Sequence, residues 1–189
     1  RRDGLDRGSV NAIVRHDGNL HVAMDRGAYV LHPADVTTGQ SAHFEKIPQL
    51  DNEVQSLVSH ASGLIAATED GIFSITADDR SQLIASYPQA WLHQSDRDDD
   101  LLWIAQSHQL TRIRWADGGW TTDMAPISLP AEITSLAEDE SSRLWIGLMN
   151  GHIGWLERRL DFVGRGLATH HRCTGGDRHG PSVPTHALQ

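Results

Sequence analysis

Short apolar segments alternate with polar turns along most of the chain. In the stretches "AIVRHDGNLHVAMD" (12–25) and "SLVSHASGLIAATED" (56–70), aliphatic and β-branched residues form runs of about five, and Gly, Asp, Asn and Ser bound each run. No segment keeps the apolar stripe of a helix for three turns. The pattern therefore predicts an all-β protein built from short strands.

The same order of strands and turns recurs four times. Each copy has an apolar-alternating segment, a polar turn, a second strand that opens on leucine, a tight turn and a third strand. The copies are "VNAIVRHDGNLHVAMDRGAYVL" (10–31), "VQSLVSHASGLIAATEDGIFSI" (54–75), "WLHQSDRDDDLLWIAQSHQLTRI" (91–113) and "ITSLAEDESSRLWIGLMNG" (133–151). The opening leucines, Leu20, Leu64, Leu102 and Leu144, are 44, 38 and 42 positions apart, a spacing typical of propeller blades.

A glycine follows the opening leucine by seven positions in three of the four copies. Gly27, Gly71 and Gly151 occupy this place, where a tight turn requires a positive φ. The third copy has Gln109 there instead. We therefore expect similar turns in three copies and a different turn geometry in the third.

The segments between the copies have room for a fourth, outer strand, at about 41–47, 82–86 and 119–124. A four-stranded antiparallel sheet cannot bury both of its faces alone, so neighbouring sheets must stack. We predict four such sheets as β-propeller blades, with a solenoid as the alternative. The predicted blades cover residues 8–50, 51–88, 89–130 and 131–165. Residues 166–189 are interpreted as a loosely ordered tail, with a degenerate fifth blade as the alternative.

The fourth copy, with its acidic turn, its "LWIG" strand and the glycine that follows, resembles the two-component regulator propeller repeat. The first copy resembles it as well, and the likeness extends over about residues 10–156. Proteins of that family carry their propellers outside the cytoplasmic membrane, ahead of a membrane helix and a cytoplasmic histidine kinase or diguanylate cyclase. The resemblance implies a periplasmic sensor module of a bacterial signalling protein, although no residue of this chain indicates a kinase or a cyclase.

The number of copies differs from what the resemblance implies. Propellers of that family have seven blades, whereas the chain holds four recognisable copies. A truncated propeller, a ring completed by several chains, or a closed ring of four would each account for the difference, and we favour the first. Open sheet faces leave edge strands and apolar surface in water, so we expect contact with other propeller blades or with another copy of the chain.

The charge balance excludes several classes of partner. The formal charge is −9, from 16 Lys and Arg against 25 Asp and Glu, and such a chain repels phosphate backbones and anionic lipid. We therefore expect no nucleic-acid partner. No apolar run approaches the roughly 20 residues of a membrane span. The amino end has neither a signal-peptide core nor an initiator Met, so we interpret the chain as a segment of a longer protein that does not itself insert into a membrane.

Four tryptophans fall into two groups. Trp103 and Trp145 directly follow opening leucines, so we assign them to blade-to-blade contacts, with stacking on a sugar as the alternative. Trp91 and Trp120 break the repeat and are the better candidates for a binding surface. His108, in the irregular turn of the third copy, is the third candidate. These last three are the predicted ligand-binding residues, with a small molecule or a carbohydrate as the ligand.

Metal binding is a further candidate function, because the chain has twelve histidines. The chain has a single cysteine, and this excludes an internal disulfide. The carboxyl-terminal stretch contains the right ligand types at His170, His171, Cys173 and His179. Their spacing matches no familiar zinc pattern. We therefore predict no metal site and no cofactor.

Two further groups of polar residues are interpreted as ordinary turn surface. His16 and His60 occupy the same place in their copies, near the turn that precedes the opening leucine. The acidic run "SDRDDD" (95–100) lacks the glycine and the distal glutamate of a calcium-binding loop, and we interpret it as a solvated turn.

Catalysis has no support in the motifs of the chain, which include no GxSxG elbow, no HExxH and no phosphate loop. A propeller enzyme such as a polysaccharide lyase or a glycosidase needs carboxylates on the innermost strands, which face the central channel. Those predicted strands, at about 11–14, 55–58, 92–94 and 134–137, supply no Asp or Glu before Glu138. We predict a non-enzymatic sensor module, with a fragment of a polysaccharide-processing propeller enzyme as the alternative.

Overall fold

The computed structural model describes residues 4–76 and 80–157 of the chain. These ranges contain fifteen strands and no helix, so no membrane-spanning helix is found among them. The strands form four antiparallel sheets, each with its strands in sequence order. The predicted tail at 166–189, with its candidate metal ligands, lies outside the described residues.

Sheets 1 and 2 have four strands each. Sheet 1 contains β1 (Val10–His16), β2 (Asn19–Met24), β3 (Gly27–His32) and β4 (His43–Lys46). Sheet 2 contains β5 (Val54–His60), β6 (Gly63–Thr68), β7 (Ile72–Ile75) and β8 (Ser81–Ala85). Each opening leucine lies on the second strand of its sheet, and β4 and β8 lie where outer strands were predicted.

Sheet 3 has four strands, and sheet 4 has three within the described residues. Sheet 3 contains β9 (Trp91–Gln94), β10 (Leu101–Gln106), β11 (Gln109–Ala116) and β12 (Gly119–Ser128). Sheet 4 contains β13 (Ile133–Glu138), β14 (Arg143–Leu148) and β15 (Ile153–Glu157). In sheets 1, 2 and 4 the pairing of the first two strands is interrupted at the same place, between Val10 and Ala12, Val54 and Ser56, and Ile133 and Ser135.

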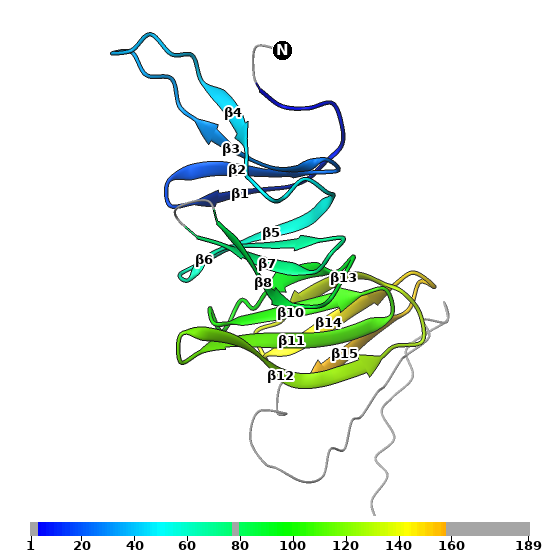
Figure 1. Ribbon diagram of the computed structural model, residues 1–189. Coiled ribbons are helices and arrows are strands. Elements are labelled where there is room, and N and C mark those ends of the chain that lie inside the picture. Colours follow the sequence, from blue (N-terminus) through cyan, green and yellow to red (C-terminus); the bar gives the residue numbers. More distant parts are fainter. Residues whose placement is uncertain (1–3, 77–79, 158–189) are drawn as a thin grey trace, which may run out of the picture.

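The sheets stack in sequence order, and the core lies between them (Figure 1). Alternation along each second strand sends the opening leucine toward the preceding sheet and the next residue toward the following sheet. In β6, Leu64 packs toward sheet 1 and Ile65 toward sheet 3. In β10, Leu102 packs toward sheet 2 and Trp103 toward sheet 4. These sheets are consecutive blades of a β-propeller, as the sequence predicted.

The first strands of neighbouring sheets lie side by side, since β1 contacts β5 and β5 contacts β9. This arrangement agrees with the prediction that the first strand is the inner one in sheets 1 to 3. The outer face of sheet 1 is covered by the amino-terminal segment, where Leu5 packs against Val22, Met24 and Tyr29. The Tyr29 hydroxyl also donates a hydrogen bond of 2.8 Å to Asp6 Oδ2.

The glycine turns follow the prediction. Gly27, Gly71 and Gly151 have φ of 124°, 142° and 81°. At Gly27 a side chain would also collide with the carbonyl oxygen of Leu50, so the position excludes any other residue on two grounds. The third copy takes its positive φ at Ser107 instead, with φ of 51°. This shift accounts for the absence of a glycine at the equivalent place.

Candidate functional site

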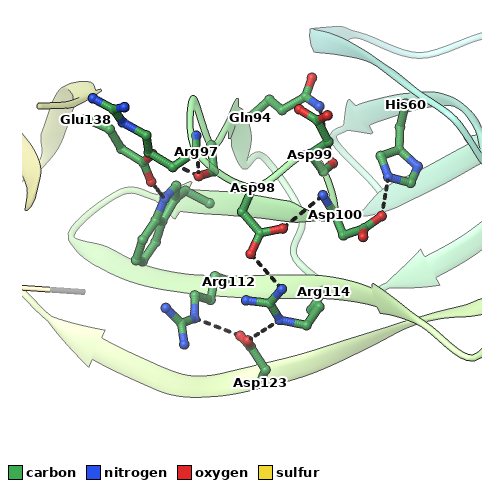
Figure 2. A network of polar contacts seen from close by, with 12 residues as sticks. His60, Gln94, Arg97, Asp98, Asp99, Asp100, Arg112, Arg114, Asp123 and Glu138 are labelled. Atoms are coloured by element: carbon green, nitrogen blue, oxygen red, sulfur yellow. Dashed lines mark hydrogen bonds and ion pairs between the residues drawn. The ribbon is translucent and has the colours of Figure 1, made fainter. Parts of the chain in front are cut away.

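The turn between β9 and β10, residues 95–100, contacts the sheets on both sides of sheet 3. Asp100 Oδ1 lies 3.3 Å from His60 Nε2 of sheet 2. On the other side, the Ser95 hydroxyl and the Asp96 backbone N–H donate to Glu138 Oε2 of sheet 4, at 2.8 and 3.1 Å. Figure 2 shows the turn between His60 and Glu138. One turn therefore links three consecutive sheets.

A row of alternating charges extends from this turn across sheet 3 (Figure 2). Asp98 Oδ2 accepts a hydrogen bond of 2.7 Å from Arg114 Nη1. Asp123 bridges two arginines, because its Oδ2 accepts from Arg114 Nε at 3.2 Å and its Oδ1 accepts from Arg112 Nε at 2.8 Å. Arg112 is only 2% exposed. Ion pairs that are this buried must keep both partners, since a single buried charge is strongly unfavourable.

The two carboxylates also control the ionisation of Arg114. Burial alone would lower the pKa of Arg114, but hydrogen bonds and charge attraction from Asp98 and Asp123 outweigh burial and raise the pKa above its usual value. The guanidinium is therefore charged at every pH at which the protein is folded. We call the row Asp98–Arg114–Asp123–Arg112 the ionic brace, and Arg114 is its fixed positive charge between two carboxylates.

The interpretation of residues 95–100 as a solvated turn is wrong for Asp98. Its side chain is 23% exposed and is paired with Arg114, because β11 brings an arginine under the turn. Asp99 stays exposed, as expected for such a turn. Within residues 4–76 and 80–157, no group of three or more His, Cys, Asp or Glu side chains is placed to hold a metal ion.

His60 is buried, so the interpretation of this residue as turn surface is also wrong. Its ring centroid lies 4.7 Å from that of Trp120 and 5.9 Å from that of Trp115, both on sheet 3. Its Nδ1 accepts the backbone N–H of Ser62 at 3.0 Å, which leaves Nε2 to carry the proton and face Asp100. The ring is therefore a contact between sheets 2 and 3.

His16 has the same role one sheet earlier. It is half-buried, and its Nδ1 lies 2.9 Å from the Ser59 hydroxyl of sheet 2. Each of the two histidines thus reaches from the end of a first strand to the following sheet. The structure gives them separate partners and does not join them as a ligand pair.

The assignment of Trp103 to a blade contact is confirmed. Trp103 is 2% exposed and lies in the core shared by sheets 3 and 4. Its indole N–H donates to Glu138 Oε1 at 2.7 Å, and the Arg112 guanidinium carbon is 5.4 Å from the ring centroid. Trp145 lies on the opposite side of sheet 4, away from sheet 3, and is 38% exposed.

The three predicted ligand-binding residues lie in different places. Trp120 packs against the core between sheets 2 and 3, and Trp91 packs against the core between sheets 3 and 4. Both are partly buried, and their rings are used mainly in packing. His108 is exposed in the turn between β10 and β11. A ligand-binding role for these residues stays a prediction.

His108 borders a shallow hollow whose lining has no Asp, Glu, Lys or Arg side chain. The hollow is lined by Pro88, Gln89, Gln106, Ser107, His108 and Gln109. Gln106 Nε2 donates to the Pro88 carbonyl at 2.7 Å, which holds the two sides of the hollow together. Gln89 and Ser107 have positive φ values of 54° and 51°, a backbone conformation that costs energy in residues other than glycine. The lining provides amide, hydroxyl and imidazole groups for hydrogen bonds to a neutral ligand.

Sequence reasoning missed the arginines of the ionic brace. Arg112 and Arg114 alternate along β11 with apolar Ile113. This alternation is typical of a strand with one solvated face, so it gives no sign that the two arginines are buried or paired. The missing information was that sheet 4 and Asp123 cover that face. Only the pattern of two arginines two positions apart, close to an acidic run, was visible as a signal.

No family model matches the sequence, and no curated protein matches it. Solved structures do share its fold. The extracellular domain of BT4673, a candidate one-component system from B. thetaiotaomicron, is 15% identical with a TM-score of 0.62, over 83% of this chain and 21% of that one. A second structure, of the same domain described as part of a candidate hybrid two-component system, is 16% identical with a TM-score of 0.60, over 82% and 21%.

A luciferin-regenerating enzyme shares the fold as well. It is 17% identical with a TM-score of 0.59, over 89% of this chain and 64% of the enzyme. At such identities the likeness concerns the fold alone. The chain spans about a fifth of the length of the BT4673 domains that it matches. The resemblance of the sequence to two-component regulator propellers agrees with this likeness at the level of the fold.

Proposed function

We propose that the chain is part of a non-catalytic sensor propeller that works outside the cytoplasm of a bacterium. The observation that carries this proposal is the common fold with the extracellular domain of BT4673, described as part of a one-component or hybrid two-component system. The repeat pattern of the sequence supports the same class of protein. The net charge of −9 argues against nucleic acid as a partner.

The placement of the acidic residues supports a non-catalytic role. Glu138 is the one acidic residue on the described inner strands β1, β5, β9 and β13, and it accepts hydrogen bonds from Trp103, Ser95 and Asp96. A glycosidase needs a second carboxyl group opposite the first. A propeller enzyme that acts on polysaccharide is the second candidate function, because a luciferin-regenerating enzyme has a similar fold.

The hollow beside His108 is the proposed place of ligand recognition. Its lining, which has amide, hydroxyl and imidazole groups and no Asp, Glu, Lys or Arg, suits a neutral small molecule rich in hydroxyl or amide groups, such as a carbohydrate. It also lies where the third copy departs from the repeat. Departures from a regular pattern tend to mark functional positions, since they are not needed for the fold.

Thermal-shift screening with neutral oligosaccharides tests this proposal, because a ligand that binds only the folded state raises the melting temperature. We expect a saturable shift that is lost in His108→Ala and in Gln109→Gly, a change that restores the glycine of the other copies. His152→Ala is the matched control, since His152 is exposed near the equivalent turn of sheet 4. A shift that survives both variants, or turnover of the oligosaccharide, would contradict the proposal.

A further inference from the structure

The amino-terminal segment carries an arginine whose neighbours are fixed on sheet 1. The segment runs along this sheet before the chain enters β1 (Figure 1). The Asp6 carboxylate accepts a hydrogen bond from the Tyr29 hydroxyl, and the Asp25 backbone N–H donates to the Ser9 carbonyl at 3.3 Å. Arg7 lies between these two contacts, so its backbone is held in place while its side chain is exposed.

A second arginine, Arg26, approaches the segment from the turn between β2 and β3. The residue before it, Asp25, places its carboxylate against Gly8, where a Cβ atom would collide with it. Asp6, which precedes the other arginine, is engaged by the Tyr29 hydroxyl. The acidic neighbour of each arginine in the sequence therefore has a different partner.

Arg7 and Arg26 line the same hollow, and Gly4, Leu5 and Asp6 form its other walls. The hollow has a volume of about 530 Å³, which is enough for a small molecule. In the part of the chain that the structure describes, neither guanidinium has an ion-pair partner. Two like charges in one hollow repel each other, and an anion between them offsets this repulsion.

Such a lack of partners is not general among the arginines. Arg112 and Arg114 are paired in the ionic brace, and the Arg143 guanidinium carbon lies 4.8 Å from the centroid of the Trp155 ring. Arg15 has no ion-pair partner among the described residues either, but it lies on β1 and does not line the hollow. Because the chain has 25 acidic and 16 basic residues, the hollow is a positive spot on a negative protein.

We propose that the hollow beside Arg7 and Arg26 binds a small molecule through one oxyanion group, a carboxylate, sulfate or phosphate. A guanidinium presents its N–H groups in a planar fork that matches two oxygens of such a group. Asp6 adds one negative charge to the two positive ones of the lining, which suits one anionic group better than a polyanion. Asp6 can also accept a hydrogen bond from a hydroxyl or ammonium group of the same ligand. The site goes beyond the proposed sensor function, and its residues differ from those of the hollow beside His108.

Modification by phenylglyoxal, followed by peptide mass spectrometry, tests the proposal at each arginine, because a bound oxyanion shields the guanidinium from the reagent. The probes are sodium acetate, sodium sulfate and sodium phosphate. Sodium chloride at equal ionic strength is the reference, since salt screens all exposed charges alike. We expect Arg7 and Arg26 to react in chloride and to be protected, in a saturable way, by at least one probe. Arg15 is the internal control and should react at the same rate throughout.

Variants of the two arginines show whether they form one site. In Arg7→Gln, the probe concentration that half protects Arg26 should rise about tenfold or more, because a hydrogen bond to a charged group contributes at least that factor. Arg26→Gln should have the same effect on the protection of Arg7. Arg15→Gln is the matched control and should leave the protection of both unchanged.

The probes also identify the chemistry of the ligand. Protection by acetate supports a carboxylate, and protection by sulfate or phosphate alone supports a tetrahedral oxyanion. The proposal is overturned if no probe protects either arginine, or if Arg15 is protected to the same extent. It is also overturned if Arg26 stays equally protected in Arg7→Gln, or if both arginines are unreactive in chloride, since another group of the protein would then cover them.

Discussion

Trp103 of sheet 3 donates its indole N–H to Glu138 Oε1 of sheet 4 over 2.7 Å. The tryptophan lies in the core between the two sheets, and the glutamate lies at the end of an inner strand. The same carboxylate also accepts hydrogen bonds from Ser95 and Asp96. One acidic side chain thus joins the buried packing of two blades to the turn that links three of them.

Replacement of Glu138 by leucine should lower the free energy of unfolding by about 1.5 to 3 kcal/mol, since hydrogen bonds to charged groups are of that strength and the indole N–H loses its acceptor. Urea unfolding followed by tryptophan fluorescence measures the change. Glu140→Leu is the control, because Glu140 is exposed in the turn that follows. Equal losses in the two variants would show that Glu138 has no special role.

Replacement of Asp123 by alanine should destabilise the protein by about 3 kcal/mol or more, because Arg112 is buried and would lose a charged partner. Asp123→Asn should cost less, as the amide oxygen still accepts a hydrogen bond. Chemical unfolding of both variants, with Asp99→Ala as the exposed control, checks this order. A loss for Asp123→Ala no greater than for the control would exclude the brace as a source of stability.

The strand pattern predicted the fold because each blade is a local unit. Leu20, Leu64, Leu102 and Leu144 occupy equivalent positions on second strands, and this equivalence follows from spacing and alternation alone. Gly27, Gly71 and Gly151 could be predicted for the same reason, since a positive φ is a local requirement. The burial of Trp103 followed once the sheets were assumed to stack.

The polar contacts between blades could not be predicted in this way. His60 ends a strand and Asp98 lies in a turn, two kinds of place where polar residues are normally solvated, and only the tertiary structure determines that one is buried and the other paired. Arg112 lies on a face that alternation marks as solvated. Such contacts depend on side chains about 40 positions apart, as for His60 and Asp100, and a single sequence does not specify them.

His60 should contribute to stability mainly through burial of its ring and only slightly through its hydrogen bond to Asp100. The Asp100 side chain is 54% exposed, so its removal in Asp100→Ala should cost less than about 1 kcal/mol. His60→Ala removes a buried ring from between sheets 2 and 3 and should cost about 2 to 4 kcal/mol. Thermal unfolding of both variants and of the double variant separates the two contributions. Equal costs for the single variants would show that the hydrogen bond to Asp100 matters more than burial of the ring.

Tyr29 should make the protein sensitive to alkali. Burial, followed by the hydrogen bond to Asp6, raises the pKa of Tyr29 from 10.0 to about 12. The folded state therefore holds the phenol proton more tightly than the unfolded state, so this contribution to stability is complete below pH 10 and is lost as the pH rises toward about 12.

Urea unfolding at several alkaline pH values should show a steeper loss of stability for the wild type than for Tyr29→Phe. Ultraviolet absorbance of the phenolate should show a transition at high pH that this variant lacks. Asp6→Asn should move that transition to lower pH, because the phenol loses a charged acceptor. If the phenolate of the wild type and that of Tyr29→Phe form over the same pH range and differ only in amplitude, the amino-terminal segment does not cover the outer face of sheet 1.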